Sequence, residues 1–423
     1  MWRRAISKVM VAAVIVVIVV AAVAGIYYYV MTRPKPKKEI VCGGTLPLTG
    51  PMARLGEWTK RGWELAVEKI NEEGGILGAK IKLIIYDDEW DEEKARTLYE
   101  RLCTVDKVDI LLGPVGSGLT YAVAPVAEKY GIPMISFWTS CGKIFEMPWP
   151  HIYGGLARPG IYGFIWTYYF VDMIANHWEE VAPPGEPKPK TMVLLLIDNV
   201  YGHECEALGI PIIEEFGFEI LWYEFYDPKT TDFTALALRI KESKPDVLIS
   251  IGYFPDSLMV ARALIEQRPE VKLIYFPEGP NDPEWVDPEK GLGEYGNYMF
   301  CYIAWPPGWH KGDADWLREE YYKRYGEPCP YQTAWAYSYF EVIKQAFELA
   351  GSLDKEAFMK ALNEGHFVTC HDEVDFTDDP TKAHGNELHM VSVGQMIDGK
   401  IEVVWPPELA THKPVIPFPG WPE

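Results

Sequence analysis

A glycine-containing loop between a strand pattern and a helix pattern is the part of the sequence best suited to bind an anion. Residues 108–141 read VDILLGPVGSGLTYAVAPVAEKYGIPMISFWTSC. The apolar runs at 108–112 and 134–136 predict strands, and the periodic segment 119–130 predicts a helix between them. Loop residues 116–118, Gly-Ser-Gly, then follow the carboxyl end of a parallel strand, where open α/β sheets bind ligands. The flexible glycines and the unpaired N–H groups at the helix start favour an anion such as a carboxylate.

Motifs for other chemistry are weaker. The acidic run at residues 87–93 lacks the glycine and glutamate spacing of a calcium-binding EF-hand loop and is typical of a solvated helix start. The glycines at 113–118 have the wrong spacing for a dinucleotide-binding loop, and neither G-x-S-x-G nor H-E-x-x-H occurs. Five potential zinc ligands lie close together without a recognised ligand spacing: His366, Cys370, His371, His384 and His389. We therefore expect a protein that is not an enzyme and has neither a cofactor nor a metal.

The composition is that of a large, acidic, globular protein. The chain has 423 residues, enough for two domains and a tail, with 48% hydrophobic and 24% charged residues. Its formal net charge is −21, although the first 38 residues carry seven Lys and Arg and no acid. The chain after residue 38 is therefore strongly acidic, which argues against nucleic-acid binding. There are seven cysteines but no C-x-x-C, and the sequence leaves the pairing open, with Cys103–Cys141 and Cys329–Cys370 as possible bridges.

The N-terminus has the pattern of a membrane segment. Residues 9–32 are uncharged and almost wholly apolar, and as a helix they would span about 36 Å, enough to cross a bilayer. The alternative is a cleavable signal peptide, because Ala-Val-Ala at 22–24 fits the small-residue cleavage pattern. The length of the apolar run favours a transmembrane anchor, and residues 34–38, PKPKK, form a stiff spacer. Both alternatives place the rest of the chain outside the cytoplasm.

Two successive runs of alternating strand and helix patterns predict two parallel sheets. The first run has strands at 40–46, 80–86, 108–112 and 134–136, with helices at 57–71, 91–103 and 119–130. The second has an aromatic helix at 161–177, strands at 191–197, 219–225, 247–251, 271–276 and 297–305, and helices at 204–216, 233–241 and 257–267. Helices at 313–325, 333–350 and 355–362 follow, and a hairpin at 391–405 turns at Asp398-Gly399. The expected fold class is α/β with two lobes.

Several motifs resemble the periplasmic substrate-binding proteins of branched-chain amino-acid ABC transporters. The pattern GP-x-x-S begins at Gly113, and A-x-x-P-V-A-E-K-x-G-I-P, I-S and T-S follow it. D-N-x-Y-G lies at 198–202, G-Y-F-P-D at 252–256 and P-E-G at 277–279. The resemblance covers residues from about 40 to about 407. It implies two Rossmann-like lobes joined by three hinge strands, which the chain would form near residues 156, 302 and 391. The implied domains are an anchor and linker (1–38), a first lobe (39–157 and 303–391), and a second lobe with a tail (158–302 and 392–423).

The same resemblance implies a binding site for a zwitterion between the lobes. The hydroxyls of Ser117 and Ser140 and the backbone at Trp138 would hold a carboxylate, because each donor gives a charge-assisted hydrogen bond. Tyr201 and Tyr253 would face the cleft from the second lobe. Glu278 would pair with the α-ammonium group of the ligand, which favours an amino acid over an amide.

Each of these residues could also have a structural role that needs no ligand. Ser117 could be a helix N-cap, Tyr201 and Tyr253 could pack at a lobe edge, and Glu278 could be a surface carboxylate. Two positions depart from the family pattern. Leu55 stands where an aromatic residue is frequent, and Trp138 stands where a small residue is common. These departures reshape the side-chain pocket and argue against strict leucine, isoleucine and valine specificity.

The resemblance predicts an extracytoplasmic solute-binding protein. It would capture a small ligand, an amino acid, in the inter-lobe cleft and deliver it to the membrane subunits of an ABC transporter. The chain would sit at the outer face of the cytoplasmic membrane, held by its N-terminal helix. Two alternative functions are compatible with the same fold: the ligand-sensing ectodomain of a receptor, or a protein that binds an amide or another small organic solute. The third alternative, an extracytoplasmic enzyme, has no catalytic motif in its favour. Ligand identity, cleavage of the anchor and oligomeric state stay open at this level.

Overall fold

The first of two main sheets is entirely parallel. The computed structural model describes residues 39–422, apart from 156–157, 159, 378 and 380. Six strands follow the order β13-β5-β4-β3-β1-β2. They are β1 (Glu39–Leu46), β2 (Lys80–Asp87), β3 (Ile110–Leu112), β4 (Met134–Ser136), β5 (Ile152–Gly154) and β13 (His384–Gly385). The central strands are short apolar runs because helices cover both faces of such a sheet.

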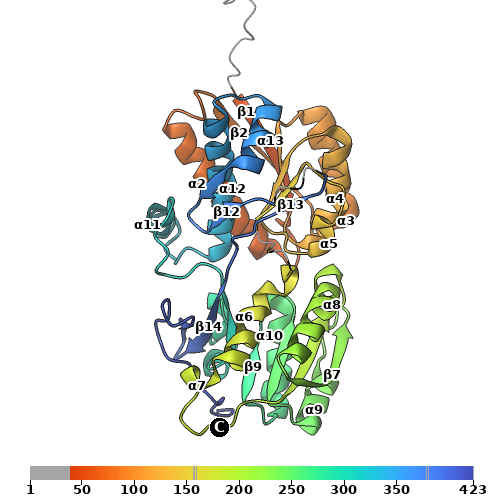
Figure 1. The fold of residues 1–423 in the computed structure, drawn as a ribbon, viewed down its shortest axis with the longest axis vertical. Coiled ribbons are helices and arrows are strands. Elements are labelled where there is room, and N and C mark those ends of the chain that lie inside the picture. The colour runs from red at the N-terminus through yellow and green to blue at the C-terminus, as the bar shows by residue number, and fades with distance from the viewer. Residues whose placement is uncertain (1–38, 156–157, 159, 378, 380, 423) are drawn as a thin grey trace, which may run out of the picture. The chain divides into compact units, whose positions relative to one another are not determined.

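Helices from both ends of the chain cover this first sheet (Figure 1). The N-terminal part supplies α2 (Ala53–Glu72), α3 (Glu92–Arg101), α4 (Ser117–Tyr130) and the short α5 (Gly142–Phe145). The C-terminal part supplies α11 (Ala314–Tyr325), α12 (Tyr331–Ala350) and α13 (Lys355–Glu364). Helices α2 and α12 pack closely, and a Cβ placed on Gly62 would lie 2.7 Å from the Cβ of Ala336. The glycine is therefore required by the close approach of the two helices.

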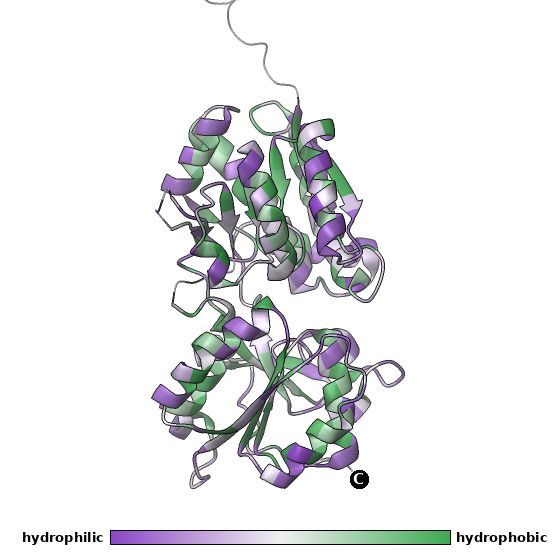
Figure 2. Ribbon diagram, turned by 90° about the vertical axis from the view of Figure 1, so that its right-hand side faces the viewer, coloured by the Kyte–Doolittle hydropathy of each residue, from purple (hydrophilic) through white to green (hydrophobic). Residues whose placement is uncertain are grey.

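The second sheet has seven strands in the order β15-β14-β10-β9-β8-β6-β7. Five strands are parallel: β6 (Thr191–Ile197), β7 (Glu219–Tyr226), β8 (Val247–Ile251), β9 (Leu273–Tyr275) and β10 (Phe300–Ile303). The last two, β14 (Ser392–Ile397) and β15 (Lys400–Trp405), form an antiparallel hairpin on one edge. Its flanking helices are α6 (Ile165–Asn176), α7 (Trp178–Val181), α8 (Val200–Glu215), α9 (Thr234–Ser243) and α10 (Phe254–Gln267). Figure 2 shows hydrophobic strands between helices that carry hydrophilic residues.

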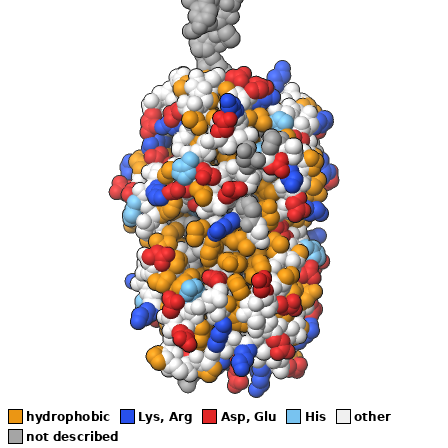
Figure 3. Space-filling view, in the orientation of Figure 1, with side chains coloured by type: hydrophobic (Ala, Val, Ile, Leu, Met, Phe, Trp, Pro, Cys, Tyr) orange, Lys and Arg blue, Asp and Glu red, His pale blue; other side chains and the backbone are white. Residues whose placement is uncertain are grey.

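The chain passes between the two sheets three times. It leaves the first sheet after β5, returns to it after β10, and enters the second sheet again between β13 and β14. We call each sheet with its helices a lobe. Hydrophobic side chains gather between the lobes on the face shown in Figure 3. Three exposed hydrophobic residues, Leu388, Met390 and Leu409, line a cavity of about 350 Å³ beside the last crossing.

The predicted α/β fold with two parallel sheets is confirmed, but several helix starts differ from the prediction. Helix α6 begins four residues later than the apolar periodicity indicates, and helices α2, α4, α8, α10 and α12 begin two to four residues earlier. Their first turns consist of small, polar and aromatic loop residues that carry no periodic signal. Helix α8, for example, begins at Val200 because the Asn199 side chain accepts a hydrogen bond from the Gly202 N–H, 3.0 Å away. The strands β5 and β13 and the small sheet of β11 (His366–Val368) and β12 (Glu373–Asp375) were not predicted.

Two sequence predictions concern the ends and the cysteines. The proposed anchor at residues 9–32 lies outside the described residues. Among the helices that the structure describes, none combines the length and the apolar character needed to span a bilayer. Cys103, Cys141, Cys329 and Cys370 are thiols, so neither of the two bridges considered above is present. The domain boundaries stay a prediction.

Candidate ligand-binding site

A small cavity lies between the lobes, at the carboxyl ends of strands from both sheets. Its volume is about 50 Å³, several times what a single water molecule requires. All six residues predicted from the sequence line it: Ser117, Trp138, Ser140, Tyr201, Tyr253 and Glu278. The remaining lining residues are Met52, Leu55, Trp90, Val115, Gly116, Trp166, Tyr302 and Trp335. Residues from five separate stretches of the first lobe and five of the second therefore meet at one place.

Two serine hydroxyls lie on the first-lobe side of the cavity. Ser117 is the first residue of α4, and Gly116 before it adopts a φ of 92°, a left-handed conformation that glycine tolerates. The Ser117 Oγ accepts a long hydrogen bond of 3.4 Å from the backbone N–H of Ser140. The Ser140 Oγ accepts one of 3.2 Å from the indole N–H of Trp166, which belongs to the second lobe. Neither bond uses the serine's own hydrogen, so both hydroxyls keep a donor for an anion.

Three further hydroxyls form a buried cluster behind these serines. The Thr139 Oγ1 lies 2.7 Å from the Thr120 Oγ1 and 2.9 Å from the Ser136 Oγ. The Thr120 and Ser136 oxygens are 3.2 Å apart, which closes the triangle. All three residues are fully buried. The cluster fixes the loop after β4 onto the first turn of α4, and the only sequence signal for it was the polar content of residues 136–140.

Trp138 lines the cavity with its side chain. Its indole N–H donates to the Thr59 Oγ1, 3.1 Å away, and its backbone N–H donates to the Tyr339 hydroxyl over 3.4 Å. The ring packs edge-on against Trp335, with 5.0 Å between centroids and an interplanar angle of 88°. The backbone N–H assigned to the ligand by the sequence thus already has a protein partner, and the large ring occupies part of the side-chain pocket.

The two predicted tyrosines come from helix starts in the second lobe. Tyr201 lies in the first turn of α8, and Tyr253 precedes α10, with its N–H donating to the Asp256 carboxylate at 3.1 Å. Their rings are 6.0 Å apart, and the Tyr253 ring meets Trp90 of the first lobe edge-on at 5.6 Å. Burial raises the pKa of both phenols, so they are neutral donors at physiological pH.

Glu278 lies in the loop after β9, and its carboxylate is held by two tyrosines. The Tyr331 hydroxyl donates to Oε2 over 2.7 Å, and the Tyr302 hydroxyl donates to Oε1. The two tyrosine oxygens are 2.9 Å apart. Burial raises the pKa of Glu278 from its ordinary value of 4.5 to about 7, although both hydrogen bonds act to lower it. Because Tyr331 starts α12 of the first lobe, this acid links the two lobes.

Aromatic rings make up half of the lining. The sequence indicated that tyrosines and tryptophans are abundant, but it did not place Trp90, Trp166, Tyr302 or Trp335 at the site. Trp166 packs against Tyr302 at 4.7 Å and against Trp335 at 5.6 Å between centroids. The indole N–H groups of Trp90 and Trp335 have no hydrogen-bond partner. Trp335 lies on α12, whose helical pattern is that of a core helix and carries no local sign of a cavity.

A charged contact closes one side of the cleft. Arg54, at the start of α2, lies 3.0 Å from the Asp282 carboxylate of the second lobe and also pairs with Glu284. Its guanidinium lies 4.5 Å from the Trp58 ring centroid and 5.7 Å from that of Phe254. The side chain thus joins both lobes by an ion pair and by ring contacts. Its 37% exposure means that water and salt weaken the ion pair.

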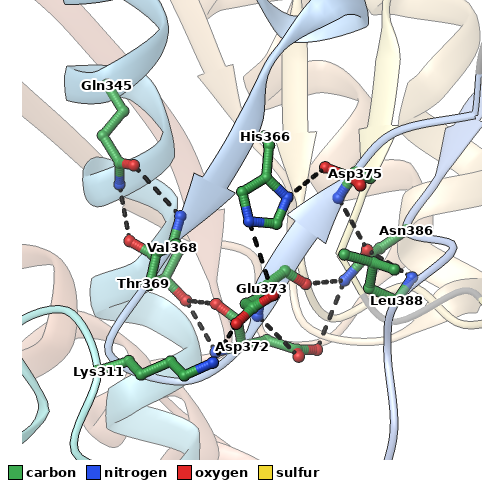
Figure 4. A network of polar contacts seen from close by, with 10 residues as sticks. All are labelled: Lys311, Gln345, His366, Val368, Thr369, Asp372, Glu373, Asp375, Asn386 and Leu388. Carbon is green, nitrogen blue, oxygen red and sulfur yellow. Dashed lines mark hydrogen bonds and ion pairs between the residues drawn. The ribbon is translucent and has the colours of Figure 1, made fainter.

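The histidine-containing segment considered for zinc forms a polar network instead (Figure 4). The His366 Nδ1 lies 2.7 Å from the Asp375 carboxylate, and the Asn386 Nδ2 donates to the Glu373 carbonyl over 3.0 Å. The Asn386 Oδ1 accepts from the Asp375 N–H at 3.2 Å. Within the described part of the chain, no three side chains of His, Cys, Asp or Glu are placed to hold a metal ion. These contacts hold the β11–β12 hairpin next to the chain that leads to β14.

Comparison with known proteins agrees with this geometry. A family profile described as periplasmic binding protein matches residues 39–399. A Leu/Ile/Val-binding protein homolog 7 of Brucella suis is 28% identical over 223 residues, 52% of this chain. The match spans only about half, 54%, of that relative's own length. The leucine-, isoleucine-, valine-, threonine- and alanine-binding protein of Pseudomonas aeruginosa is 24% identical over 329 residues, 76% of this chain and 82% of that protein.

Among solved structures, the branched-chain amino acid transporter substrate-binding protein LivJ of Streptococcus pneumoniae, in complex with isoleucine, has a TM-score of 0.72. The two are 22% identical, and the superposition covers 86% of this chain and 98% of that one. At this identity the likeness concerns the fold. It confirms the two-lobed α/β architecture that the sequence motifs predicted.

Proposed function

We propose, since this chain belongs to the family of periplasmic binding proteins, that it is an extracytoplasmic solute-binding protein for an amino acid. It captures the ligand between its lobes and delivers it to the membrane subunits of an ABC transporter. The observation that carries the proposal is an inter-lobe cavity with hydroxyl donors on one side and one acid on the other. The names of two relatives support the ligand class: the one from Brucella is a Leu/Ile/Val-binding protein homolog, and the one from Pseudomonas is a leucine-, isoleucine-, valine-, threonine- and alanine-binding protein.

The two sides of the cavity match the two charges of an amino acid. The hydroxyls of Ser117 and Ser140 receive the carboxylate, because anions are best held by several donors at once. Glu278 faces the ammonium group, and Tyr201 and Tyr253 enclose the ligand from the second lobe. The contacts of Glu278 with Tyr331 and of Arg54 with Asp282 join the lobes in the closed form. A ligand that makes contacts with both lobes shifts the population toward this form, which the transporter recognises.

The location follows from the same proposal. Residues 1–38 act as a membrane anchor or signal and as a spacer, so the binding unit works on the outer face of the cytoplasmic membrane. The described unit begins at β1, directly after this segment. Protease treatment of spheroplasts or protoplasts, in which the outer face of the cytoplasmic membrane is exposed, followed by detection of the N-terminal and C-terminal parts, would test the topology. Protection of the C-terminal part would contradict it.

Calorimetry on the full chain in detergent tests the proposed ligand class. Each of the twenty amino acids is titrated, with amides, sugars and simple organic acids as comparison ligands. We expect saturable binding of at least one amino acid or close derivative, and a rise in melting temperature that follows its concentration. The binding should disappear when either the amine or the carboxylate is blocked. Tighter binding of an amide or sugar would contradict the assignment of an amino-acid ligand. It would still be consistent with a role in solute capture.

A second experiment tests delivery rather than binding. The liganded and unliganded full chains are compared for capture of the membrane subunits of an ABC transporter from solubilised membranes of the source cells. We expect the liganded form to capture more. Turnover of the bound solute by the purified chain would contradict a role in transport and favour an enzyme.

A further inference from the structure

The lining of the cavity is unusual for an amino-acid site because half of it is aromatic. Seven of its fourteen residues carry rings: Trp90, Trp138, Trp166, Tyr201, Tyr253, Tyr302 and Trp335. No lysine or arginine is part of the lining. Ring faces carry partial negative charge and attract cations, most strongly those of tryptophan. The cavity is therefore suited to a positively charged group that is surrounded by rings.

The acceptor oxygens of Ser117, Ser140 and Glu278 each already accept one protein hydrogen bond. The Ser117 oxygen accepts from the Ser140 N–H, and the Ser140 oxygen accepts from the Trp166 indole. Both carboxylate oxygens of Glu278 accept from tyrosine hydroxyls, one of them 2.7 Å away. A primary ammonium group has three N–H donors, and each loses free energy if it is buried without an acceptor. An ammonium group whose hydrogens are replaced by methyl groups has no such requirement.

Hydrogen-bond donors, in contrast, are in excess. The indole N–H groups of Trp90 and Trp335 lack a partner, and Trp335 is only 1% exposed. The hydroxyl hydrogens of Ser117 and Ser140 are not used in the serine bonds described above. Unpaired buried donors are rare in folded proteins, and a ligand with acceptor oxygens would satisfy them. A carboxylate offers about four acceptor positions.

We propose, on the basis of the function proposed above, that the ligand is a small amino acid with a methylated ammonium group, a betaine. Its methylated head lies among the aromatic rings and near Glu278. Its carboxylate receives hydrogen bonds from Ser117, Ser140 and the indole groups of Trp90 and Trp335. The cavity volume of about 50 Å³ is well below the roughly 150 Å³ that accommodates benzene. The small volume therefore favours a compact ligand.

Titration of the full chain with a methylation series tests this proposal. Glycine, N-methylglycine, N,N-dimethylglycine and trimethylglycine are compared by calorimetry, with leucine and alanine as unmethylated ligands. We expect affinity to rise with each methyl group, by at least tenfold from glycine to trimethylglycine. Tighter binding of glycine, alanine or leucine would overturn the betaine assignment and leave the proposed function intact. Binding of none of these ligands or other amino acids would overturn both.

Substitution of the unpaired indoles tests the carboxylate contacts. Trp335→Phe and Trp90→Phe keep a ring and remove the N–H, so each should weaken trimethylglycine binding about tenfold. The matched control is Trp222→Phe on β7, because the Trp222 indole N–H is also unpaired but lies outside the cavity. Melting curves show whether each variant is folded. If the Trp335→Phe variant does not fold, Trp90→Phe provides the test. Unchanged affinity in a folded Trp90→Phe or Trp335→Phe variant would overturn that residue's role.

Discussion

The two sides of the cavity differ in how they hold charge. The first-lobe side, made by Ser117, Ser140 and the hydroxyl cluster behind them, is neutral at any physiological pH and is linked by hydrogen bonds. The second-lobe side depends on one acid, Glu278, whose pKa is about 7 and whose oxygens are tied to tyrosines of both lobes. Under the proposed function, the first lobe would supply a constant anion site. The second lobe would make binding sensitive to pH and to closure.

Removal of the acid should have the largest effect. Glu278→Ala deletes the only charged group of the lining and leaves two buried tyrosine hydroxyls without their acceptor. We expect ligand affinity to fall by about a hundredfold or more, since losing one partner of a buried charged contact costs roughly 2–5 kcal/mol. Calorimetry measures the loss. Glu294→Ala, which removes an exposed acid of the same lobe, is the control and should leave affinity unchanged. Wild-type affinity in Glu278→Ala would show that the second-lobe side does not bind the ligand's charge.

The serines of the first-lobe side should contribute less individually. Ser117→Ala and Ser140→Ala each remove one donor to the carboxylate, and a hydrogen bond to a charged group is worth about 2 kcal/mol. We expect each to weaken binding roughly thirtyfold without changing its pH dependence. The control is Thr104→Ala, which removes an exposed hydroxyl outside the cavity. An altered pH profile in either serine variant would mean that the two sides are not independent.

The pH dependence should separate the two sides most clearly. Below pH 7 Glu278 takes up a proton and loses its attraction for a cationic group, so affinity should fall about tenfold from pH 8 to pH 6. Folding stability should respond in the opposite sense. Because the folded-state pKa is raised, the stabilising contribution of protonated Glu278 is complete below about 4.5 and is lost as pH rises to about 7.

Glu278→Gln cannot titrate, so it should flatten the affinity profile between pH 6 and 8. It should reduce the pH dependence of stability without abolishing it, because burial also raises the pKa values of Glu341, Asp256 and Asp282. Calorimetry over this range measures the affinity, and urea unfolding of the ligand-free chain measures the stability. A pH dependence of affinity that persists in Glu278→Gln would assign it to another group.

The contact at the edge of the cleft should have the smallest effect. Arg54→Gln removes the ion pair with Asp282 and weakens the closed form without touching the cavity's hydroxyls or Glu278. Since Arg54 is partly exposed, we expect only about a threefold loss of affinity, seen at low salt and reduced at high salt. The matched control is Arg239→Gln. Arg239 also pairs with an acid, Glu224, and lies 4.0 Å from the centroid of the Trp222 ring, but all three residues belong to the second lobe. An equal effect of both variants would exclude a specific role in closure.

The fold was largely predictable because the strands of parallel sheets occur in a sequence as short apolar runs between helical segments. Strands β6 and β8 are buried almost throughout and matched their predicted ranges. Strands β5 and β13 have only three and two residues, too few to show a period. The early starts of α4 and α8 escaped prediction because their first residues, 117–118 and 200–203, show no apolar periodicity.

The site was predictable only where it consists of loops at strand ends. Ser117, Tyr253 and Glu278 lie two to five residues after the ends of strands, and their motifs predicted that they share one site. Trp335 and Tyr331 come from α12, where nearly every residue of the first turns is buried and nothing local distinguishes a ring facing a cavity from one in the core. The tyrosine partners of Glu278 depend on long-range packing, which a sequence pattern does not contain.

The packing of α2 against α12 also has a consequence for the timing of biosynthesis. The Thr333 hydroxyl donates to the Trp58 carbonyl over 3.0 Å, and these residues are separated by 275 positions. At roughly 5–20 residues per second, a ribosome needs on the order of 14–55 s to make that stretch. The five parallel strands of the second sheet, within residues 191–303, are complete before α12 is made. Limited proteolysis of stalled nascent chains of increasing length should therefore find these five strands protected first. The helix α2 at the start of the chain gains its α12 partner later, and the second sheet is completed last, when β14 and β15 are made.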